Sequence, residues 1–163
     1  ADLPTARECI ETYKAAARAA GREPRPEHIL IGMHTVIADT DEEARRLLSE
    51  AKVYFDEVLM DGPREAQRIV LQKTRYFQQD ASRERFAQRL GARREATLDD
   101  LIERGGVLCG SPQTVVKQIE RIHGELGNGI FNFTVKVGTL PDGAVRRGME
   151  LFRDRVLPHV RDL

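Results

Sequence analysis

Residues 107–160 read VLCGSPQTVVKQIERIHGELGNGIFNFTVKVGTLPDGAVRRGMELFRDRVLPHV, and this stretch decides the fold. Ser111 can cap a helix, and Pro112 suits the first helical position, where a missing N–H costs nothing. An apolar stripe then follows at helical spacing as far as the glycine at position 127. Its members are Val115, Ile119, Ile122 and Leu126.

After that helix the same stretch continues with a strand and a second helix. Residues 130–137 are typical of a strand, and the sequence GTLP at 138–141 turns the chain. Apolar positions from Val145 to Val156 then predict a last amphipathic helix that ends near Pro158. Helix, strand and helix in this order are typical of a parallel α/β sheet.

The strand predicted over residues 130–137 carries the first functional hint. Strand side chains alternate, so Asn132, Thr134 and Lys136 share one side, while Phe131 and its alternating neighbours share the other. In a closed parallel barrel, polar residues inside the carboxyl end of a strand lie where barrel enzymes have their active sites. The alternative is an edge strand whose polar face contacts water.

The amino-terminal half predicts a second strand. Residues 29–38 (ILIGMHTVIA) are almost continuously apolar, as expected for a strand buried on both faces of a parallel sheet. Thr40 and the acidic residues after it then begin a helix. Residues 61–106 are rich in Arg and Gln with scattered apolar positions, and they are interpreted as a helical insertion. This segment is too long for a plain crossover and too apolar for a disordered linker.

Composition restricts the class of protein. The 163 residues are enough for one domain, and the 26 basic and 26 acidic residues cancel. That balance argues against nucleic-acid or anionic-membrane partners, and no apolar run approaches the ~20 residues of a membrane span. Cys9 and Cys109 lie far apart without a CxxC pattern, which favours a reducing compartment such as the cytoplasm. The histidines and Cys109 lack the spacing of a shared metal site, so we expect none.

Only two convincing strands emerge from the sequence. A two-stranded parallel sheet is a poor independent structure because its edges are unpaired. Either the helices bury this sheet in an unusual way, or the remaining strands lie on another polypeptide. We favour the second and expect an α/β chain that is the end of a larger barrel, with a missing barrel half or a further copy in a homo-oligomer as its partner.

Several short motifs, taken together, resemble a known family. They are VIADTDEEAR at 36–45, GSPQTV at 110–115, IFNF at 130–133, GTLP at 138–141, MELF at 149–152 and VLPHVR at 156–161. In this order and spacing they resemble the carboxyl end of bacterial luciferase-like monooxygenases. The resemblance spans nearly the whole chain and is clearest over residues 107–161.

The resemblance implies a (β/α)8 barrel that binds reduced FMN, or the deazaflavin F420 in relatives, and oxidises a small organic substrate with O₂. Residues 29–38 and 130–137 match barrel strands seven and eight, and residues 61–106 match an insertion near the active-site mouth. The first six strands, which carry most flavin contacts in the family, have no counterpart here. No catalytic residue is therefore assigned, and we expect the isolated chain to be inactive.

The candidates for contact with flavin or substrate are Asn132, Thr134 and Lys136, with His34 and Thr35 from the other strand. The alternative for each is a polar residue satisfied within a barrel core or at a partner interface. Two rival functions remain open. One is a non-catalytic module that binds a partner or dimerises through its strand edges, and the other is an F420-dependent oxidoreductase of the same superfamily.

Overall fold

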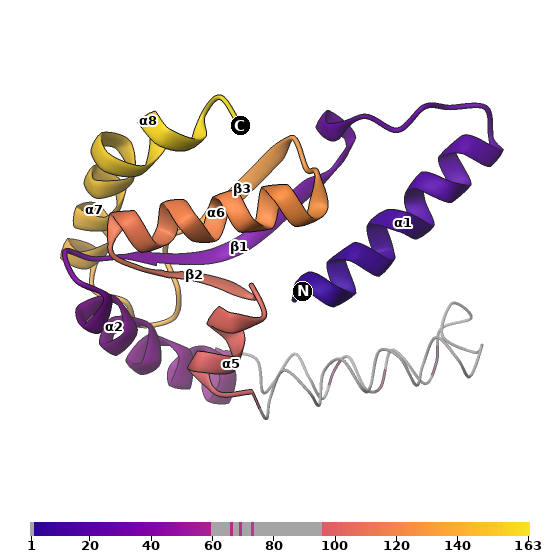
Figure 1. Ribbon diagram of the computed structural model, residues 1–163. Helices are drawn as coiled ribbons and strands as arrows, with labels where there is room; N and C mark the ends of the chain where they lie inside the picture. The colour runs from indigo at the N-terminus through magenta and orange to yellow at the C-terminus, as the bar shows by residue number, and fades with distance from the viewer. Residues whose placement is uncertain (1, 60–65, 67–68, 70–72, 74–95) are drawn as a thin grey trace.

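The chain forms a three-stranded parallel sheet with helices packed against it (Figure 1). This computed structural model describes residues 2–59, 66, 69, 73 and 96–163. The strands are β1 (Leu30–Ile37), β2 (Val107–Gly110) and β3 (Ile130–Thr134), in the spatial order β2-β1-β3. The longer helices are α1 (Leu3–Ala19), α2 (Asp41–Tyr54), α6 (Pro112–Leu126) and α7 (Asp142–Leu151), and the shorter helical segments are η1 (Pro26–His28), η2 (Phe55–Leu59), α5 (Leu98–Glu103), η4 (Phe152–Val156) and α8 (Leu157–Val160).

The central strand β1 is shared between two neighbours. Its amino half pairs with β3, from Leu30 opposite Ile130 to His34 opposite Thr134. Its carboxyl half pairs on the other side with β2, from His34 opposite Val107 to Ile37 opposite Gly110. Both ladders are parallel, so the carboxyl ends of β1 and β2 meet at one edge of the sheet.

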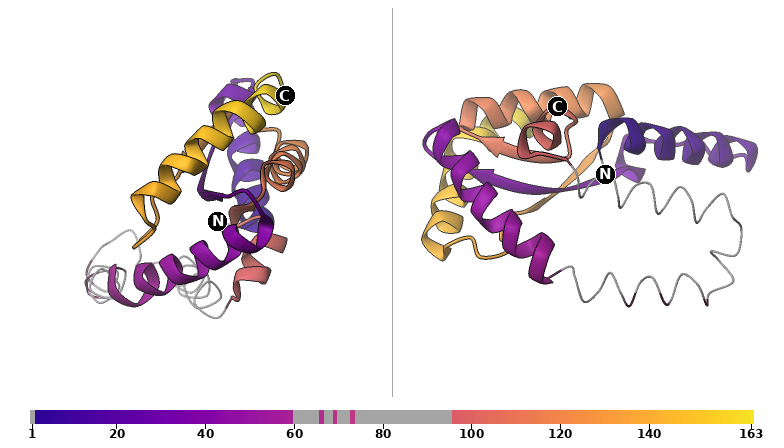
Figure 2. Two further views of the ribbon diagram at one scale, coloured as in Figure 1. Left: turned by 90° about the vertical axis from the view of Figure 1, so that its left-hand side faces the viewer. Right: turned by 90° about the horizontal axis from the view of Figure 1, so that it is seen from below.

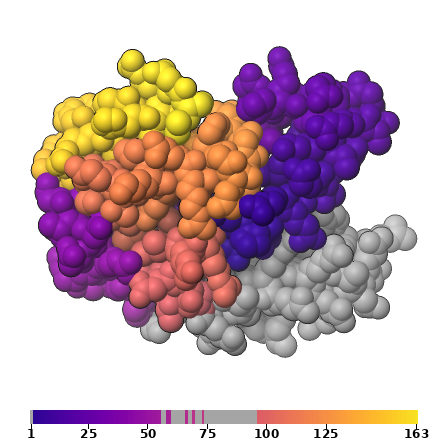
Figure 3. Space-filling model, viewed as in Figure 1, coloured from indigo at the N-terminus to yellow at the C-terminus, as the bar shows by residue number. Residues whose placement is uncertain are grey.

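One face of the sheet packs against α6, with α1 and the C-terminal helices beside it. The apolar stripe of α6 is at most 3% exposed, and it meets Met33, Ile37 and Leu108 from the strands. Burying each of these aliphatic side chains is worth roughly 1.5–3 kcal/mol. Leu3 and Ile10 of α1 and Val156 of η4 complete this core. In the space-filling view, α6 lies between α1 and the C-terminal helices on this side of the molecule (Figure 3).

The opposite face is covered by α2 and α5. The right-hand view of Figure 2 shows α6 and α2 on opposite sides of the strands. Val36 and Val107 from the strands meet Leu47 and Leu48 of α2 and Leu101 of α5. This cover reaches only the carboxyl half of β1, because on the amino half of the same face Leu30 and Ile130 stay 57% and 41% exposed. The sheet is therefore sealed on one face and half open on the other.

The helix boundaries follow the sequence signals. Thr40 Oγ1 accepts the Glu43 N–H at 3.2 Å and begins α2. Thr97 and Asp100 form a reciprocal capping box at α5, and Gly127 ends α6 in the left-handed conformation at φ 61°. The helices expected after residues 40 and 111 are both present.

Two expectations about the strands need correction. Val107–Gly110 is a strand, β2, so the sheet has three strands rather than two; the four-residue run was hidden because it passes directly into a helix start. β3 ends at Thr134 rather than at residue 137, and Val137 is buried against α2 instead of continuing the alternation of Phe131 and Phe133. Most of the predicted insertion over residues 61–106 lies outside the described residues, and within its described part α5 is helical as expected.

Gly138 explains why the strand stops where it does. Its φ of 48° lies in the left-handed region, and a Cβ placed there would stand 2.3 Å from the carbonyl oxygen of Ala51. The turn after β3 therefore packs directly on the backbone of α2, which draws Val137 and Leu140 into the core on that side. Because of this packing, the chain after β3 turns toward α2 instead of continuing along the strand direction.

Candidate functional site

The half-open face of the sheet gathers three of the five candidate residues. Asn132 and Thr134 are exposed on β3, in register with Gly32 and His34 of β1. In-register residues of parallel strands point to the same side, so these four positions line one face. Nothing lies within 4 Å of a Cβ placed on Gly32, which leaves a flat strip of backbone between the side chains.

His34 stands where the open half of this face meets the part covered by α2. Its ring meets Phe55 edge-on, with 5.0 Å between ring centroids. His34 also lines a hollow of about 20 Å³, enough for roughly one water molecule. Lys52 and Phe55 share this hollow with apolar side chains from α2, α5, β2 and the turn after β3. His34 lies opposite Val107, the first residue of β2, so the hollow lies beside the middle of β1 and the amino end of β2.

The other two candidates lie elsewhere. Thr35 is 2% exposed on the opposite face of β1, and its hydroxyl donates to the Met33 carbonyl at 3.3 Å. Lys136 lies beyond the end of β3, and its Nζ donates to the Leu140 carbonyl and to Asp142 Oδ1, each at 2.5 Å. Lys136 also lowers the pKa of the Asp142 carboxyl through this hydrogen bond. The predicted alternation is therefore correct for Asn132 and Thr134, which lie on one face of β3, and wrong for Lys136, which lies beyond the end of the strand.

A polar clamp joins the helices that follow β1 and β2. Asp41, in the first turn of α2, accepts the Ser111 N–H at 2.6 Å through Oδ1 and the Thr114 hydroxyl at 3.0 Å through Oδ2. The Ser111 backbone bond holds the pKa of Asp41 below its ordinary value, against the opposing effect of partial burial. A side chain on Gly110 would collide with this carboxylate at 2.8 Å, so glycine permits the close approach.

This clamp changes the interpretation of Ser111. The serine occupies the N-cap position of α6, but its hydroxyl bonds to Thr114 Oγ1 at 3.2 Å rather than to the helix backbone. The carboxylate of Asp41 satisfies the helix start from a different element, 70 residues away in sequence. The sequence did show an acidic first turn in α2, but nothing local to Asp41 pointed to α6.

Cys109 is a buried strand residue rather than a reactive thiol. It is 2% exposed, and burial raises its pKa to about 12, so the thiolate is strongly disfavoured. Its backbone N–H and carbonyl both bond to the side-chain amide of Gln118, each at 3.0 Å. That amide takes the place of a neighbouring strand and closes the outer edge of β2. Cys9 is exposed, and both cysteines are free thiols.

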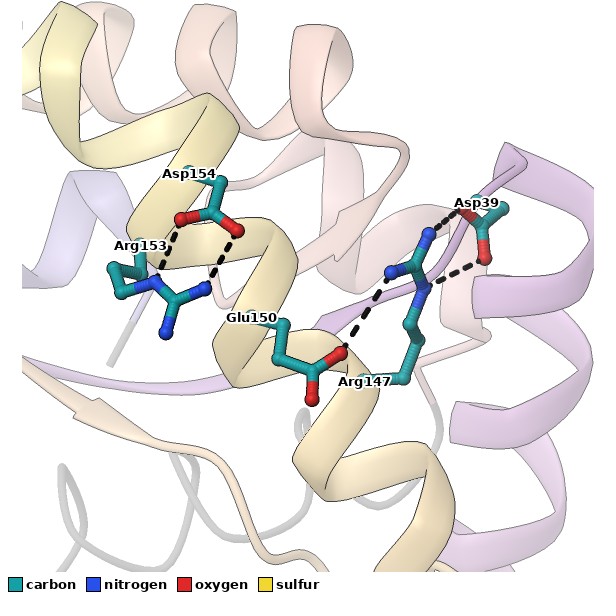
Figure 4. Close-up of polar contacts among 5 residues, drawn as sticks. All are labelled: Asp39, Arg147, Glu150, Arg153 and Asp154. Carbon is teal, nitrogen blue, oxygen red and sulfur yellow. Dashed lines mark hydrogen bonds and ion pairs between the residues drawn. The ribbon is translucent and has the colours of Figure 1, made fainter.

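An exposed chain of ion pairs ties α7 to the end of β1 (Figure 4). Arg147 donates to both carboxylate oxygens of Asp39, at 3.0 Å from Nε and 2.6 Å from Nη2. This pairing lowers the pKa of Asp39, and Arg147 also approaches Glu150 at 3.7 Å. Arg153 and Asp154 form a second two-bond pair in η4. The groups are about half exposed or more, so their role is to orient α7 rather than to act in a buried site.

Two further observations concern the described part of the chain. Within it, no three His, Cys, Asp or Glu side chains gather closely enough to hold a metal ion. None of the helices in the described ranges is long and apolar enough to cross a membrane.

A family model described as luciferase-like monooxygenase matches residues 1–128. The chain belongs to the luciferase-like monooxygenase family. The resemblance is thereby confirmed at the level of the family. The match includes the motifs at 36–45 and 110–115, whereas the motifs from residue 130 onward, in the stretch where the resemblance was expected to be clearest, lie outside the matched residues. A comparison with curated protein sequences gave no match.

Solved structures show the same fold. The monooxygenase RslO1 from Streptomyces bottropensis superposes with a TM-score of 0.63 at 22% identity, over 96% of this chain and 38% of that one. The oxygenating constituent of 3,6-diketocamphane monooxygenase from Pseudomonas putida, a type II Baeyer–Villiger monooxygenase solved with FMN, gives 0.64 at 24% identity, over 98% and 41%. The chain therefore spans about two fifths of the length of each.

Proposed function

We propose that this chain is the carboxyl-terminal part of a (β/α)8 barrel that oxidises a small organic substrate with O₂ and reduced FMN. The observation that carries the proposal is the half-open sheet face of a family member, lined by Gly32, His34, Asn132 and Thr134. In a barrel, helices cover the outer face of the strands, the inner face is a packed core, and the ligand binds where inner-facing residues reach the carboxyl ends of the strands. Here α2 and α5 cover the carboxyl half of β1 on the proposed inner face. α6 covers the opposite face of β1 and β3, which suits an inner role for the open one.

The unpaired sheet edges support the same proposal. β3 has a strand partner on one side only, and on the β2 side of β1 the register begins only at His34. In a closed barrel a further strand would pair with the outer edge of β3, and another would have to displace the Gln118 amide from the outer edge of β2. The missing barrel strands are therefore the principal partner that we propose, with the 61–106 segment as the insertion beside the mouth.

The residues on this face suit one wall of a flavin site. The bare backbone at Gly32 offers a flat surface, and Leu30 and Ile130 beside it are apolar and exposed. The amide of Asn132 and the hydroxyl of Thr134 can exchange hydrogen bonds with the polar edge of a ring. When bound, reduced FMN would supply the electrons that activate O₂. These side chains would orient the ring and exclude water from it, while a phosphate site would come from the other strands.

Flavin binding by a completed barrel tests this proposal. Residues 1–163 would replace, in the Pseudomonas putida oxygenating constituent, the two fifths of that chain that they match. We expect FMN binding by fluorescence quenching, and oxygen consumption when a reductase supplies reduced FMN. Asn132→Ala and Thr134→Ala should each weaken FMN binding about tenfold, the loss of roughly one hydrogen bond, whereas Thr139→Ala on the turn should not. A folded chimera that binds neither FMN nor F420 would refute the proposal.

The two rivals differ in what they bind. F420 in place of FMN would make the protein a reductase or dehydrogenase, and the absorbance spectrum of the bound cofactor distinguishes the two. The unpaired edges and exposed apolar residues Leu30 and Ile130 also suit a module that binds a partner without catalysis. The two free thiols suit a reducing compartment, so the cytoplasm is the proposed location.

A further inference from the structure

Helix α7 crosses the carboxyl end of the central strand. Ala144 and Val145, near its start, pack against the core between the sheet and α2, whereas Leu151, at its end, lies in the core beneath α6. Between these two contacts, a Cβ placed on Gly148 would stand 3.0 Å from the carbonyl oxygen of Ile37, the last residue of β1. Figure 1 shows α7 at the end toward which β1 and β2 run. The helix therefore lies across the edge at which barrels and open α/β sheets bind their ligands.

Few buried contacts hold α7 in this place. Leu140 before the helix and Leu151 at its end are each 2% exposed, but none of residues 141–150 between them is buried. Gly143 and Gly148 also lower the helix propensity of the segment. Sparse apolar burial and solvent-exposed backbone hydrogen bonds are typical of segments that open locally while the rest of a protein stays folded. The helix is therefore a weakly packed segment between two buried anchors.

An ion pair fastens this weakly packed helix to the strand end. Arg147 donates two hydrogen bonds to Asp39, which lies two residues after the end of β1 (Figure 4). Both side chains are about half exposed, so their attraction is modest and is weakened by salt. After α7 the helix widens into the π-helical turn η4, where the Leu157 N–H bonds to the Phe152 carbonyl; such turns are frequent at functional sites. We call the pair between Arg147 and Asp39 the latch.

We propose that α7 is a lid over the carboxyl end of β1, and that the latch sets how often this lid opens. Leu140 and Leu151 stay in place while the helix between them lifts, which exposes the end of β1 and the start of α2. The functional meaning of the lid rests on the proposed function, because in the completed barrel this edge belongs to the mouth through which a ligand enters. The motion itself involves only residues of this chain, so its test does not depend on flavin.

Amide hydrogen exchange of the 163-residue chain tests the lid. The amides of residues 146–150 should exchange at least about tenfold faster than those of α6, because α7 opens without global unfolding. Arg147→Gln and Asp39→Asn should each speed exchange in α7 by about two- to fivefold, the range expected for an exposed ion pair, and leave α6 unchanged. The two substitutions together should have no more effect than either alone, because both remove the same contact.

Arg153→Gln is the matched control for the latch. It also removes an exposed arginine that makes two bonds to a carboxylate, but Asp154 is its neighbour within η4 and does not tie α7 to the strand. Exchange in α7 should therefore be the same as in the parent chain. The completed barrel adds a second readout. Because a lid limits entry and exit alike, Arg147→Gln should speed FMN association and release by the same factor and leave Kd unchanged.

Any one of four results would overturn the inference. The amides of α7 could exchange no faster than those of α6, the latch variants could leave exchange in α7 unchanged, or Arg153→Gln could speed it as much as they do. In the completed barrel, the fourth is a changed Kd for FMN at an unchanged association rate. A barrel that binds no flavin refutes the proposed function instead, and the exchange measurements still decide whether α7 is a lid.

Discussion

Removing the Asp41 carboxylate tests whether a single side chain of α2 holds the start of α6. In Asp41→Ala, both the Ser111 N–H and the Thr114 hydroxyl lose their acceptor. Loss of a helix cap costs about 0.5–2 kcal/mol, and hydrogen bonds to a charged acceptor lie at the upper end of the range for single bonds. The site is partly open to water, so we expect the free energy of unfolding to fall by about 1–2 kcal/mol. For a chain of this size that lowers Tm by roughly 2–8 °C.

Urea and thermal unfolding followed by far-UV circular dichroism would measure this loss. Glu42→Ala is the matched control, because it removes a carboxylate from the same first turn of α2 without touching α6. Only the helix-dipole contribution is lost there, about 0.3–1 kcal/mol. A double-mutant cycle between Asp41→Ala and Thr114→Val should give a coupling energy of about 0.5 kcal/mol or more. The reasoning is refuted if Asp41→Ala costs no more than Glu42→Ala, or if the cycle shows no coupling.

The clamp also predicts a dependence on pH. The pKa of Asp41 is lower in the folded chain than its ordinary value of 3.8, so its ionised form is favoured by folding. Its contribution is complete above that ordinary value and is lost as the pH falls through the lower folded value. The stability difference between the parent chain and Asp41→Asn should therefore be constant near neutral pH and shrink below about pH 4. A difference that grows on acidification would contradict this assignment.

Three further predictions concern single residues. Gly138→Ala should destabilise the fold by about 1–3 kcal/mol, measured by urea unfolding, because a Cβ meets the Ala51 carbonyl and φ is positive; an unchanged midpoint would show that the turn does not pack on α2. Gly124→Ala should raise stability by about 0.5–1 kcal/mol in the same assay, since the position is helical with open space around it, and a loss would show that the site is crowded. A thiol reagent should label Cys9 quickly and Cys109 only in denaturant; rapid labelling of both would contradict the burial of Cys109.

Local patterns predicted the helices and the central strand well. The helix start at Ser111-Pro112 and the helix end at Gly127 are both present where the sequence predicted them, although the cap of that start comes from Asp41 and not from the Ser111 hydroxyl. Residues 29–38 contain β1, as the apolar run predicted, but the expected burial on both faces is wrong for its amino half, where Leu30 is 57% exposed. These signals act within a few residues, so the sequence reveals them directly.

The site was only partly predictable because its contacts are long-range. Alternation placed Asn132 and Thr134 on one side of β3, and the register brought His34 to the same face. The alternation does not reach Lys136, because β3 ends at Thr134 and the turn around Gly138 packs on α2. The Asp41 clamp spans 70 residues, and no local pattern encodes it. Successive side chains on a strand point to opposite faces, so Thr35 faces α6 while His34 faces the half-open side.

The amide of Gln118 has a consequence for anyone who would redesign this molecule. The side-chain amide of Gln118, on helix α6, makes the two hydrogen bonds to Cys109 that the backbone of a neighbouring strand would otherwise make. One residue thereby satisfies the outward backbone groups of Cys109 at the edge of β2. Grafting additional β/α units onto that flank would require this glutamine to be removed first, whereas the opposite flank is ready for extension as it stands. The side-chain amide of Gln118 thus determines at which edge of the sheet further strands could be added.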